Sequence, residues 1–219
     1  MKISIITAAY NSEETVRETL DSFCEQIWHD KEMIFVDGAS SDRTLAIAEE
    51  YESSNVLILS EPDRGMYDAL NKGFRLASGD ALGVLNSDDR FHSNSSMTKI
   101  AEALSEHHMV HGSVNYVAKH SSNRVVRIWT AEPRPDDGFK SGWMPAHTSF
   151  FVRRAVCDAV GEFDLNYSIS ADYDWMIRAI DLSHFSLGTI DEVLIDMKVG
   201  GMSTSGLASH LKHLSLIHI

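Results

Sequence analysis

Cysteine is nearly absent from this chain, since Cys24 and Cys157 are the only two among its 219 residues. Two thiols that lie so far apart in the sequence do not form the framework of a disulfide-stabilised secreted protein. The sequence therefore predicts a protein of a reducing compartment, the cytoplasm.

Long apolar runs are also missing. The N-terminal apolar run stops at Asn11, which makes it too short for the core of a signal peptide. No later run approaches the roughly 18 consecutive apolar residues that a spanning helix needs. The sequence predicts no membrane span.

Basic residues are scarce relative to acidic ones: 19 Lys and Arg stand against 32 Asp and Glu, for a formal net charge of −13. Binding along a nucleic-acid backbone needs a basic surface, so we expect no nucleic-acid partner. Electrostatic attachment to an anionic membrane is disfavoured for the same reason. An anionic ligand would need local cations or a metal ion to attract it.

The first half of the chain, by contrast, is a regular alternation of strand-like and helix-like segments. Each short apolar run is followed by a polar turn and then by apolar residues at helical spacing. Repeats of this kind predict an α/β fold with a Rossmann-like, mainly parallel sheet that carries helices on both faces. The predicted strands are residues 2–8, 32–37, 55–60 and 81–85.

Two of the predicted helices have specific sequence signals. Asn11 and Glu14 resemble a capping box that opens the first helix. In the third helix, Ser78 and Gly79 fit a C-cap. The apolar faces are Val16, Leu20, Phe23 and Ile27 in the first helix, and Met66, Leu70 and Phe74 in the third. Asp68, Asn71 and Arg75 share the opposite face of the third helix, either as a solvated face or as ligand contacts.

After residue 108 the pattern is less regular. We expect a hairpin from residues 109–119 and 124–130, and a loop over 132–142. The remaining expected elements are a strand at 147–154, a short helix at 155–161, a helix at 171–181 and a strand around 193–199. No linker divides the chain, so the sequence predicts one domain, residues 1–219, with a nucleotide-sugar-binding half (1–108) and an acceptor-side half (109–219).

Polar residues follow each of the first four strands, at the edge where ligands bind to open parallel sheets. Each group alone is ordinary turn and N-cap chemistry. Four groups at one edge instead predict a ligand crevice, with the Arg64–Gly65 loop at a helix start as a phosphate-side contact. The residues concerned include Thr7, Ala8, Tyr10, Asn11, Asp37, Gly65, Asp88 and Asp89.

Asp88 and Asp89 form the strongest local signal, because adjacent carboxylates at the end of a buried strand repel each other. Mg²⁺ and Mn²⁺ prefer carboxylate oxygens and commonly bind one or two of them together with substrate phosphates. The pair therefore predicts a divalent cation that neutralises a bound diphosphate.

In the second half, Asp172 and Asp174 lie in the first turn of a predicted helix, where the helix dipole alone would favour them. The functional interpretation is that one of them is a general base that takes a proton from an acceptor hydroxyl. His147 precedes an apolar strand, and a buried core histidine is the favoured interpretation over a ligand or substrate contact.

Five ordered stretches resemble the family 2 glycosyltransferases with the GT-A fold, and most closely bacterial enzymes that build surface polysaccharides of the colanic acid or exopolysaccharide type. The resemblance covers residues 3–182. A trace of a late family segment follows at Gly200, Gly201, Met202 and Ser203. The stretches are ISIITAAYN, FVDGASSDRT, EPDRGMYDALNKGFRLASGD, LNSDD and ADYDW.

The resemblance implies inverting transfer of a sugar from a nucleotide-diphosphate donor, usually a UDP-sugar, to a glycan or lipid-linked acceptor in polysaccharide biosynthesis. Asp68 would lie beside the donor, Asp88 would contact the ribose or sugar, Asp89 would bind Mn²⁺ or Mg²⁺, and Asp172 would be the catalytic base. Contact with the inner face of the membrane is implied in the same way. By motif position, the remaining donor-binding residues would be Thr7, Ala8, Tyr10, Asn11, Asp37, Gly65 and Asn71.

One departure from the family pattern is Ala171, where many relatives have Glu before the base. It keeps open a non-catalytic nucleotide-sugar-binding module. A nucleotidyltransferase is the other alternative, but TAAYNSEE after the first strand lacks the glycine-rich basic loop expected of one. An oxidoreductase is disfavoured, because no G-x-G-x-x-G follows that strand.

Overall fold

The structure is a computed structural model that describes residues 1–53, 55–118 and 121–200. Gly201, Met202 and Ser203 of the late family segment lie outside the described residues.

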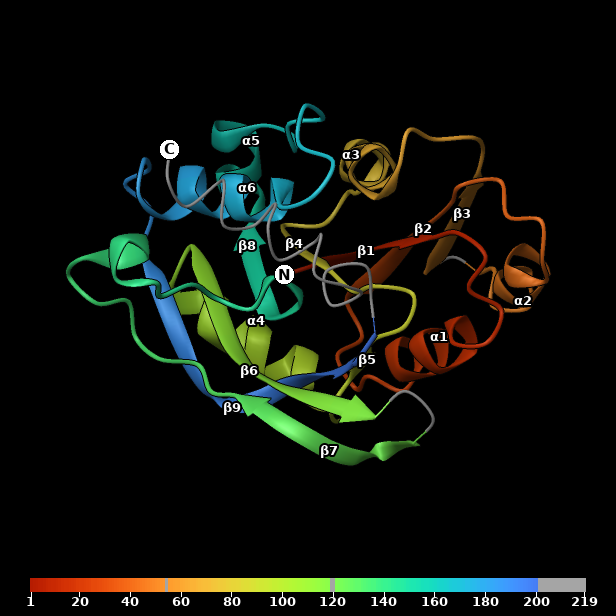
Figure 1. The fold of residues 1–219 in the computed structure, drawn as a ribbon, viewed down its shortest axis with the longest axis horizontal. Helices are drawn as coiled ribbons and strands as arrows, with labels where there is room; N and C mark the ends of the chain where they lie inside the picture. Colours follow the sequence, from red (N-terminus) through yellow and green to blue (C-terminus); the bar gives the residue numbers. More distant parts are fainter. Residues whose placement is uncertain (54, 119–120, 201–219) are drawn as a thin grey trace.

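Nine strands of the described chain form one sheet, in the order β3-β2-β1-β4-β8-β6-β9-β5, with β7 paired to β6 (Figure 1). β1 to β4 run parallel, as expected from the βα repeats. β8 is antiparallel to both β4 and β6, whereas β6 and β9 are parallel. The strands are β1 (Ile3–Ala9), β2 (Lys31–Asp37), β3 (Val56–Ser60), β4 (Ala81–Val84), β5 (Arg90–Phe91), β6 (Met109–Ala118), β7 (Ser121–Trp129), β8 (Phe150–Arg153) and β9 (Leu187–Lys198).

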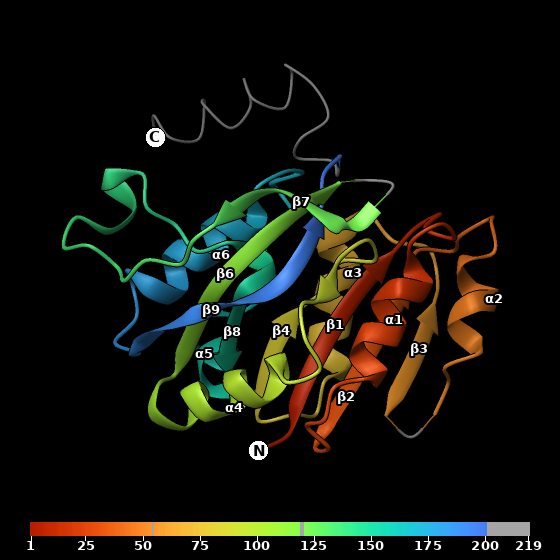
Figure 2. The ribbon, with the colours of Figure 1, turned by 90° about the horizontal axis from the view of Figure 1, so that it is seen from below.

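Helices cover both faces of this sheet, which confirms the predicted α/β layering (Figure 2). One face packs against α1 (Val16–Cys24), α2 (Thr44–Glu49) and α4 (Ser96–Glu106). The other packs against α3 (Met66–Leu76), α5 (Arg154–Val160) and α6 (Ala171–Ile180). Alternate residues of β1 divide between the faces, since Ile3 and Ile5 join the first apolar cluster and Ile6 joins the second.

The two helix-end predictions are wrong. α1 begins only at Val16, and Asn11 has a left-handed backbone (φ 48°) in the preceding turn, so no capping box forms with Glu14. α3 ends at Leu76 with Ala77 as its C-cap. Gly79 is needed for another reason: a Cβ there would lie 2.6 Å from the Ser4 hydroxyl oxygen.

The polar face of α3 also differs from a solvated face. Asp68 and Asn71 are buried, whereas Arg75 reaches out to an ion pair with Glu162. Met66 and Phe74 are only partly buried. α3 therefore has protein on both sides, because the segment around Phe163 covers the face that the periodicity leaves polar.

In the second half the hairpin of β6 and β7 is confirmed. The predicted strand at 147–154 begins instead with a 3₁₀ turn, η2 (His147–Ser149), and becomes β8 only at Phe150. The loop over 132–142 contains the short 3₁₀ helix η1 (Gly138–Ser141).

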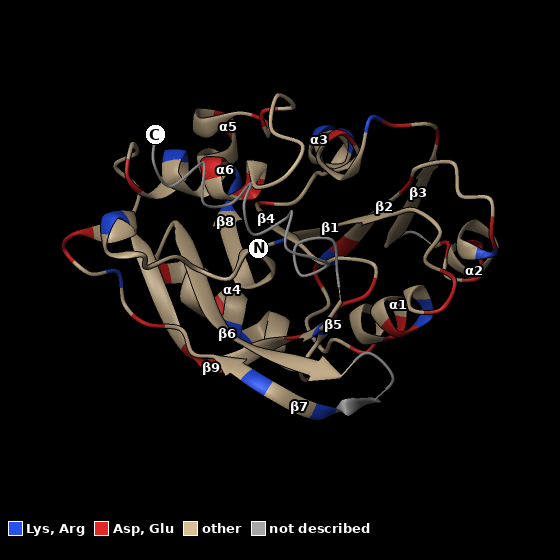
Figure 3. Ribbon diagram, viewed as in Figure 1, with Lys and Arg blue, Asp and Glu red and all other residues tan. Residues whose placement is uncertain are grey.

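The order β2-β1-β4 places the reversal of strand order between β1 and β4, the position where open α/β sheets bind ligands. Lys and Arg residues are interspersed with the more numerous Asp and Glu over the described ribbon (Figure 3). Among the described helices, none combines the length and apolarity that crossing a bilayer requires.

Candidate active site

The loops after β1 and β2 are joined by Asn11. Its backbone N–H donates to the Ser40 hydroxyl at 2.9 Å, and its side-chain oxygen accepts the Ser41 backbone N–H at 2.9 Å. The β1 loop is also joined to the β4 loop, since the Ser12 and Ser87 hydroxyls lie 2.9 Å apart. Three predicted site segments therefore meet at one edge of the sheet.

At the end of β1, three of the predicted contact residues differ sharply in exposure. Tyr10 is 65% exposed, Ala8 is partly buried, and Thr7 is completely buried. The Thr7 hydroxyl has no hydrogen-bond partner among the described residues. Of these three residues, only Tyr10 presents a large surface to a ligand.

Asp37 ends β2 as a completely buried carboxylate. It accepts a hydrogen bond from the Ser60 hydroxyl at 2.6 Å and one from the Ser40 backbone N–H at 3.1 Å. These bonds tie the ends of β2 and β3 together and fix the carboxylate at the predicted crevice.

Asp68 and Gly65 shape the start of α3. Gly65 has φ +115°, a backbone conformation that other residues rarely adopt, and it precedes the first helical residue. Asp68 accepts the Arg64 backbone N–H at 3.0 Å and the Arg64 guanidinium at 3.2 Å. The bonds from Arg64 lower the pKa of Asp68. They also hold Arg64, whose side chain is 76% exposed, beside this turn.

The Asn71 side chain makes its hydrogen bonds to the protein itself. Its amide donates to the Phe163 carbonyl at 3.0 Å and accepts the Phe163 backbone N–H at 2.9 Å. Only 1% of the residue is exposed. In this structure Asn71 anchors the loop before α6 to α3 rather than facing open solvent.

Asp88 and Asp89 follow β4 as predicted, but in different surroundings. Asp89 is 1% exposed and accepts bonds from the Asn86 side-chain amide (2.9 Å) and the Lys198 backbone N–H (3.2 Å). Asp88 is only partly buried. Burial, together with the charge of Asp88, raises the pKa of Asp89 well above its usual range, and burial also raises the pKa of Asp88.

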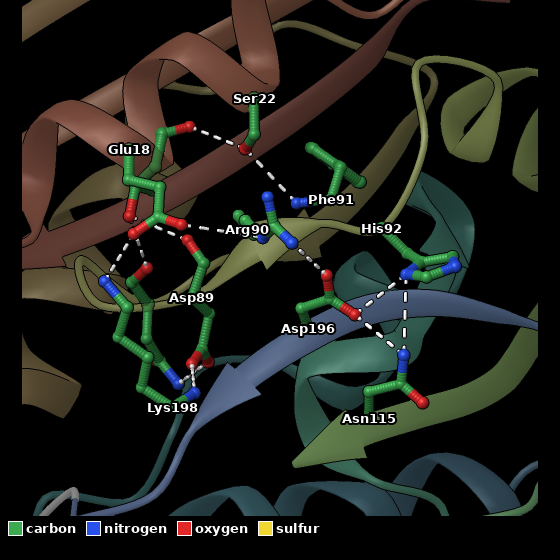
Figure 4. Close-up of polar contacts among 11 residues, drawn as sticks. Glu18, Ser22, Asp89, Arg90, Phe91, His92, Asn115, Asp196 and Lys198 are labelled. Carbon is green, nitrogen blue, oxygen red and sulfur yellow. Dashed lines mark hydrogen bonds and ion pairs between the residues drawn. The ribbon is translucent and has the colours of Figure 1, made fainter. Parts of the chain in front are cut away.

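The buried side of this acidic pair is a network of charges contributed by α1, β5 and β9 (Figure 4). The Lys198 ammonium pairs with Glu18, which also lies near Arg90. Asp196 accepts bonds from Arg90 at 2.7 Å and from Asn115 at 2.9 Å. The network fixes β9 against β5 and so places the Lys198 backbone N–H at Asp89.

The donor set at Asp88 and Asp89 fits a hard divalent cation that completes its shell from a ligand. Within residues 1–53, 55–118 and 121–200, no three His, Cys, Asp or Glu side chains gather into a cage for a metal ion. Mg²⁺ typically needs only one or two carboxylates beside substrate phosphates. Each Asp89 oxygen accepts one bond and keeps a further lone pair. A cation would also offset the repulsion between the two carboxylates.

Asp172 lies at the start of α6, with its side chain 23% exposed. Its Oδ1 accepts a hydrogen bond of 2.8 Å from the Tyr67 hydroxyl. Asp174, the other acid of this turn, pairs instead with Arg178 at 2.9 Å. Ala171, at the position of the family Glu, is completely buried in the apolar cluster beneath α6. Only Asp172 of the two acids faces the β4 end.

His147 connects the two halves of the site, and its interpretation as a core histidine is wrong. Its side chain is 29% exposed, Nδ1 lies 3.4 Å from the second Asp172 oxygen, and Nε2 lies 3.3 Å from the Asn86 amide nitrogen. Asn86, His147, Asp172 and Tyr67 all line one cavity of about 40 Å³. The structure thus brings the candidate base within two side chains of Asp89.

Sequence reasoning missed Tyr67 and Lys198 as site residues. Tyr67 lies next to Asp68 in the same motif, and no role was predicted for it from the sequence. The contribution of Lys198 is a backbone N–H, for which a sequence carries no side-chain signal.

Residues 4–161 match the family model described as glycosyl transferase family 2. The PGL/p-HBAD biosynthesis glycosyltransferase of Mycobacterium tuberculosis (strain ATCC 25177 / H37Ra) is 31% identical over 181 residues, 80% of this chain and 68% of the relative. The uncharacterized glycosyltransferase Rv1514c of Mycobacterium tuberculosis is 31% identical over 214 residues, 95% of this chain and 77% of that protein.

Solved structures share the fold. S. aureus TarS 1-349 in complex with UDP-GlcNAc superposes with a TM-score of 0.78 at 20% identity, over 99% of this chain and 65% of TarS 1-349. The mannosyltransferase PcManGT from Pyrobaculum calidifontis, in complex with GDP-Man and Mn²⁺, gives 0.72 at 18% identity over 99% of this chain and 62% of that one. The chain thus spans just under two thirds of these solved chains. With its curled, mainly parallel sheet and its matching motifs, it belongs to glycosyl transferase family 2 and has the GT-A fold.

Proposed function

We propose that this protein transfers a sugar, with inversion, from a nucleotide-diphosphate donor to a hydroxyl of a glycan or lipid-linked acceptor in polysaccharide biosynthesis. The observation that carries the proposal is the approach of Asp172 to the β4 end: His147 and Asn86 alone separate it from Asp89. An acid–base group that lies two side chains away from a carboxylate pair suited to a divalent cation fits a single displacement.

The first half of the chain, residues 1–108, holds the donor in this proposal. Tyr10, the Asp37 carboxylate and the Arg64–Asp68 turn lie at or after the ends of β1, β2 and β3, on one side of the β1–β4 reversal. UDP is the favoured nucleotide, supported by the UDP-GlcNAc complex of TarS. A GDP-sugar is the competing donor, since PcManGT was solved with GDP-Man and Mn²⁺.

Asp88 and Asp89 would hold Mn²⁺ or Mg²⁺. When bound, such an ion supplies a positive charge that stabilises the leaving diphosphate. Asp89 is fixed by Asn86 and the Lys198 backbone, so its oxygens keep one orientation during the reaction.

Asp172 would take the proton of the attacking acceptor hydroxyl, from the half formed by residues 109–219. Tyr67 donates to one of its oxygens and orients the carboxylate. No side chain needs to form a covalent bond to the sugar, since one displacement inverts the anomeric carbon. The cytoplasmic location and contact with the inner face of the membrane remain predictions from the sequence.

Calorimetric titration with UDP and then GDP, each with and without Mn²⁺, tests the donor side. We expect one nucleotide to bind only when Mn²⁺ is present, and we expect Asp89→Asn to weaken this Mn²⁺-dependent binding. UDP release from UDP-sugars, with water or para-nitrophenyl glycosides as acceptor, tests the chemistry. Asp172→Asn should bind nucleotide as the wild type does and release no UDP.

Two other results would favour the alternatives. Nucleotide binding without any turnover by the folded wild type would indicate a non-catalytic nucleotide-sugar-binding module. Release of diphosphate from a nucleoside triphosphate in the presence of a sugar phosphate would indicate a nucleotidyltransferase.

A further inference from the structure

Four polar side chains from separate parts of the chain form one continuous line between the acidic pair and the candidate base. Asn86 follows β4, His147 opens η2, Asp172 opens α6 and Tyr67 lies in the first turn of α3. Their successive contacts measure 3.3 Å (Asn86 to His147), 3.4 Å (His147 to Asp172) and 2.8 Å (Tyr67 to Asp172). All four line the same cavity.

The chemistry of these groups fixes the direction of each hydrogen bond. The Asn86 side-chain nitrogen donates to Asp89, and its second hydrogen can only be donated as well. His147 Nε2 must therefore accept, which leaves the proton of a neutral imidazole on Nδ1. Nδ1 is the atom that faces the Asp172 carboxylate.

Hydrogen bonds hold the backbone around His147 in place, so the position from which its imidazole ring extends is fixed. Ser149, two residues later, is completely buried, and its hydroxyl donates to the Gly112 carbonyl of β6 at 2.7 Å. Its backbone N–H donates to the Ala146 carbonyl at 3.0 Å. η2 is thereby fastened to the sheet at the level where β8 pairs with β4.

We propose that His147 is a positioning residue. Asn86 holds the imidazole ring in place, and the ring in turn holds the Asp172 carboxylate toward the acceptor. The Tyr67 hydroxyl donates to one oxygen of Asp172, and His147 Nδ1 lies 3.4 Å from the other, so the two contacts together restrain the orientation of the carboxylate. This inference rests on the proposed function, because it assigns the role of base to Asp172.

Substitution of His147 by Asn and by Gln distinguishes the two ring nitrogens. The Asn amide nitrogen lies near the position of Nδ1 and can still donate to Asp172. The Gln amide nitrogen lies near the position of Nε2, so it reaches toward Asn86 instead. A role in filling space would not separate these two variants, whereas a role for the Nδ1–H does.

The experiment measures kcat and donor KM for UDP release, and the UDP affinity with Mn²⁺, in His147→Ala, His147→Asn and His147→Gln. We expect kcat to fall on the order of tenfold to hundredfold in His147→Ala and His147→Gln, with UDP affinity unchanged. His147→Asn should recover most of the loss in kcat. Thermal unfolding verifies that all three variants are folded.

Three results would overturn the inference: His147→Asn no better than His147→Ala, His147→Gln as active as His147→Asn, or equal loss of UDP affinity in all three. Asp172→Asn separates this failure from failure of the proposed function. If Asp172→Asn is inactive while His147→Ala retains wild-type kcat, only the positioning role fails. If Asp172→Asn retains wild-type kcat, the assignment of the base fails.

Discussion

Tyr67 donates a hydrogen bond of 2.8 Å to Asp172, although 105 positions separate the two residues in the sequence. Burial, together with the charge of Asp172, raises the pKa of the Tyr67 hydroxyl, which therefore stays protonated and remains a donor across the physiological range. A buried donor with a single charged acceptor is an orienting contact, and its removal has a measurable consequence.

Tyr67→Phe should lower kcat for UDP release by about tenfold to hundredfold, because a hydrogen bond to a charged group contributes about 1.5–3 kcal/mol and its loss frees the carboxylate. The ring is kept, so its contact with Phe163 at 5.6 Å survives. Steady-state kinetics provides the measurement. Tyr51→Phe is the matched control, since the Tyr51 hydroxyl donates to Asp21 at 2.6 Å on the surface. Equal kcat in both variants would contradict the orienting role.

Asn71→Ala should destabilise the fold by about 3 kcal/mol, because it leaves the backbone N–H and C=O of Phe163 without their partners in a buried place. Denaturant unfolding measures the effect. Asn55→Ala, in an exposed turn, is the control and should change little. If Asn71→Ala kept full stability and lost only UDP affinity, Asn71 would be a ligand contact first.

Thr7→Val should raise the free energy of unfolding by about 1 kcal/mol, because the Thr7 hydroxyl is buried without a partner and a methyl group fills the same space. Thr19→Val is the matched comparison. Its hydroxyl is also buried, but it donates to the Asp89 carbonyl at 2.7 Å, so this variant should be destabilised. A loss of stability in Thr7→Val as large as in Thr19→Val would refute the prediction.

Acid should weaken the fold partly through Glu32. Burial alone would raise its pKa, but hydrogen bonds from Lys2, Ser4 and Ser78 outweigh it and lower the pKa to about 2. A carboxyl whose folded pKa lies below its unfolded value stabilises the fold above the unfolded pKa. This contribution is lost as the pH falls from about 4.5 toward about 2.

Unfolding of Glu32→Gln across the same pH range supplies the measurement. The difference in stability between wild type and variant should be greatest near neutral pH and shrink below pH 4.5. Glu52→Gln, at an exposed position, should show no such trend. A difference that grew with acidity would mean that the sign of the Glu32 contribution is wrong.

The fold was largely predictable because its first half consists of short apolar strands that alternate with amphipathic helices. β1 to β4 and α1 to α3 lie where the periodicity places them, within a few residues. The helix ends were less predictable. Asn11 takes part in a turn with Ser40 and Ser41 that a capping signal cannot distinguish from a helix start.

The sequence predicted the position of site residues only where these residues follow the end of a single strand. Asp88 and Asp89 lie in the turn after β4, so the sequence places them at the sheet edge. The partners of Asp172 come together through the antiparallel pairing of β4 with β8, which brings His147 to Asn86. No spacing in the sequence encodes that pairing. The burial of Asn71 depends likewise on the segment around Phe163, which is distant in the chain.

The pairing of β4 with β8, and of β8 with β6, makes residues 1–108 and the strands that follow them parts of one hydrogen-bonded sheet. A hinge motion between these two parts would break the backbone hydrogen bonds of the sheet. The two parts therefore do not move apart as separate rigid bodies. The distance between Asp89 and Asp172 is therefore set by the sheet. Substrates must bind across this fixed distance, and any conformational change during turnover takes place in the loops at the sheet edge.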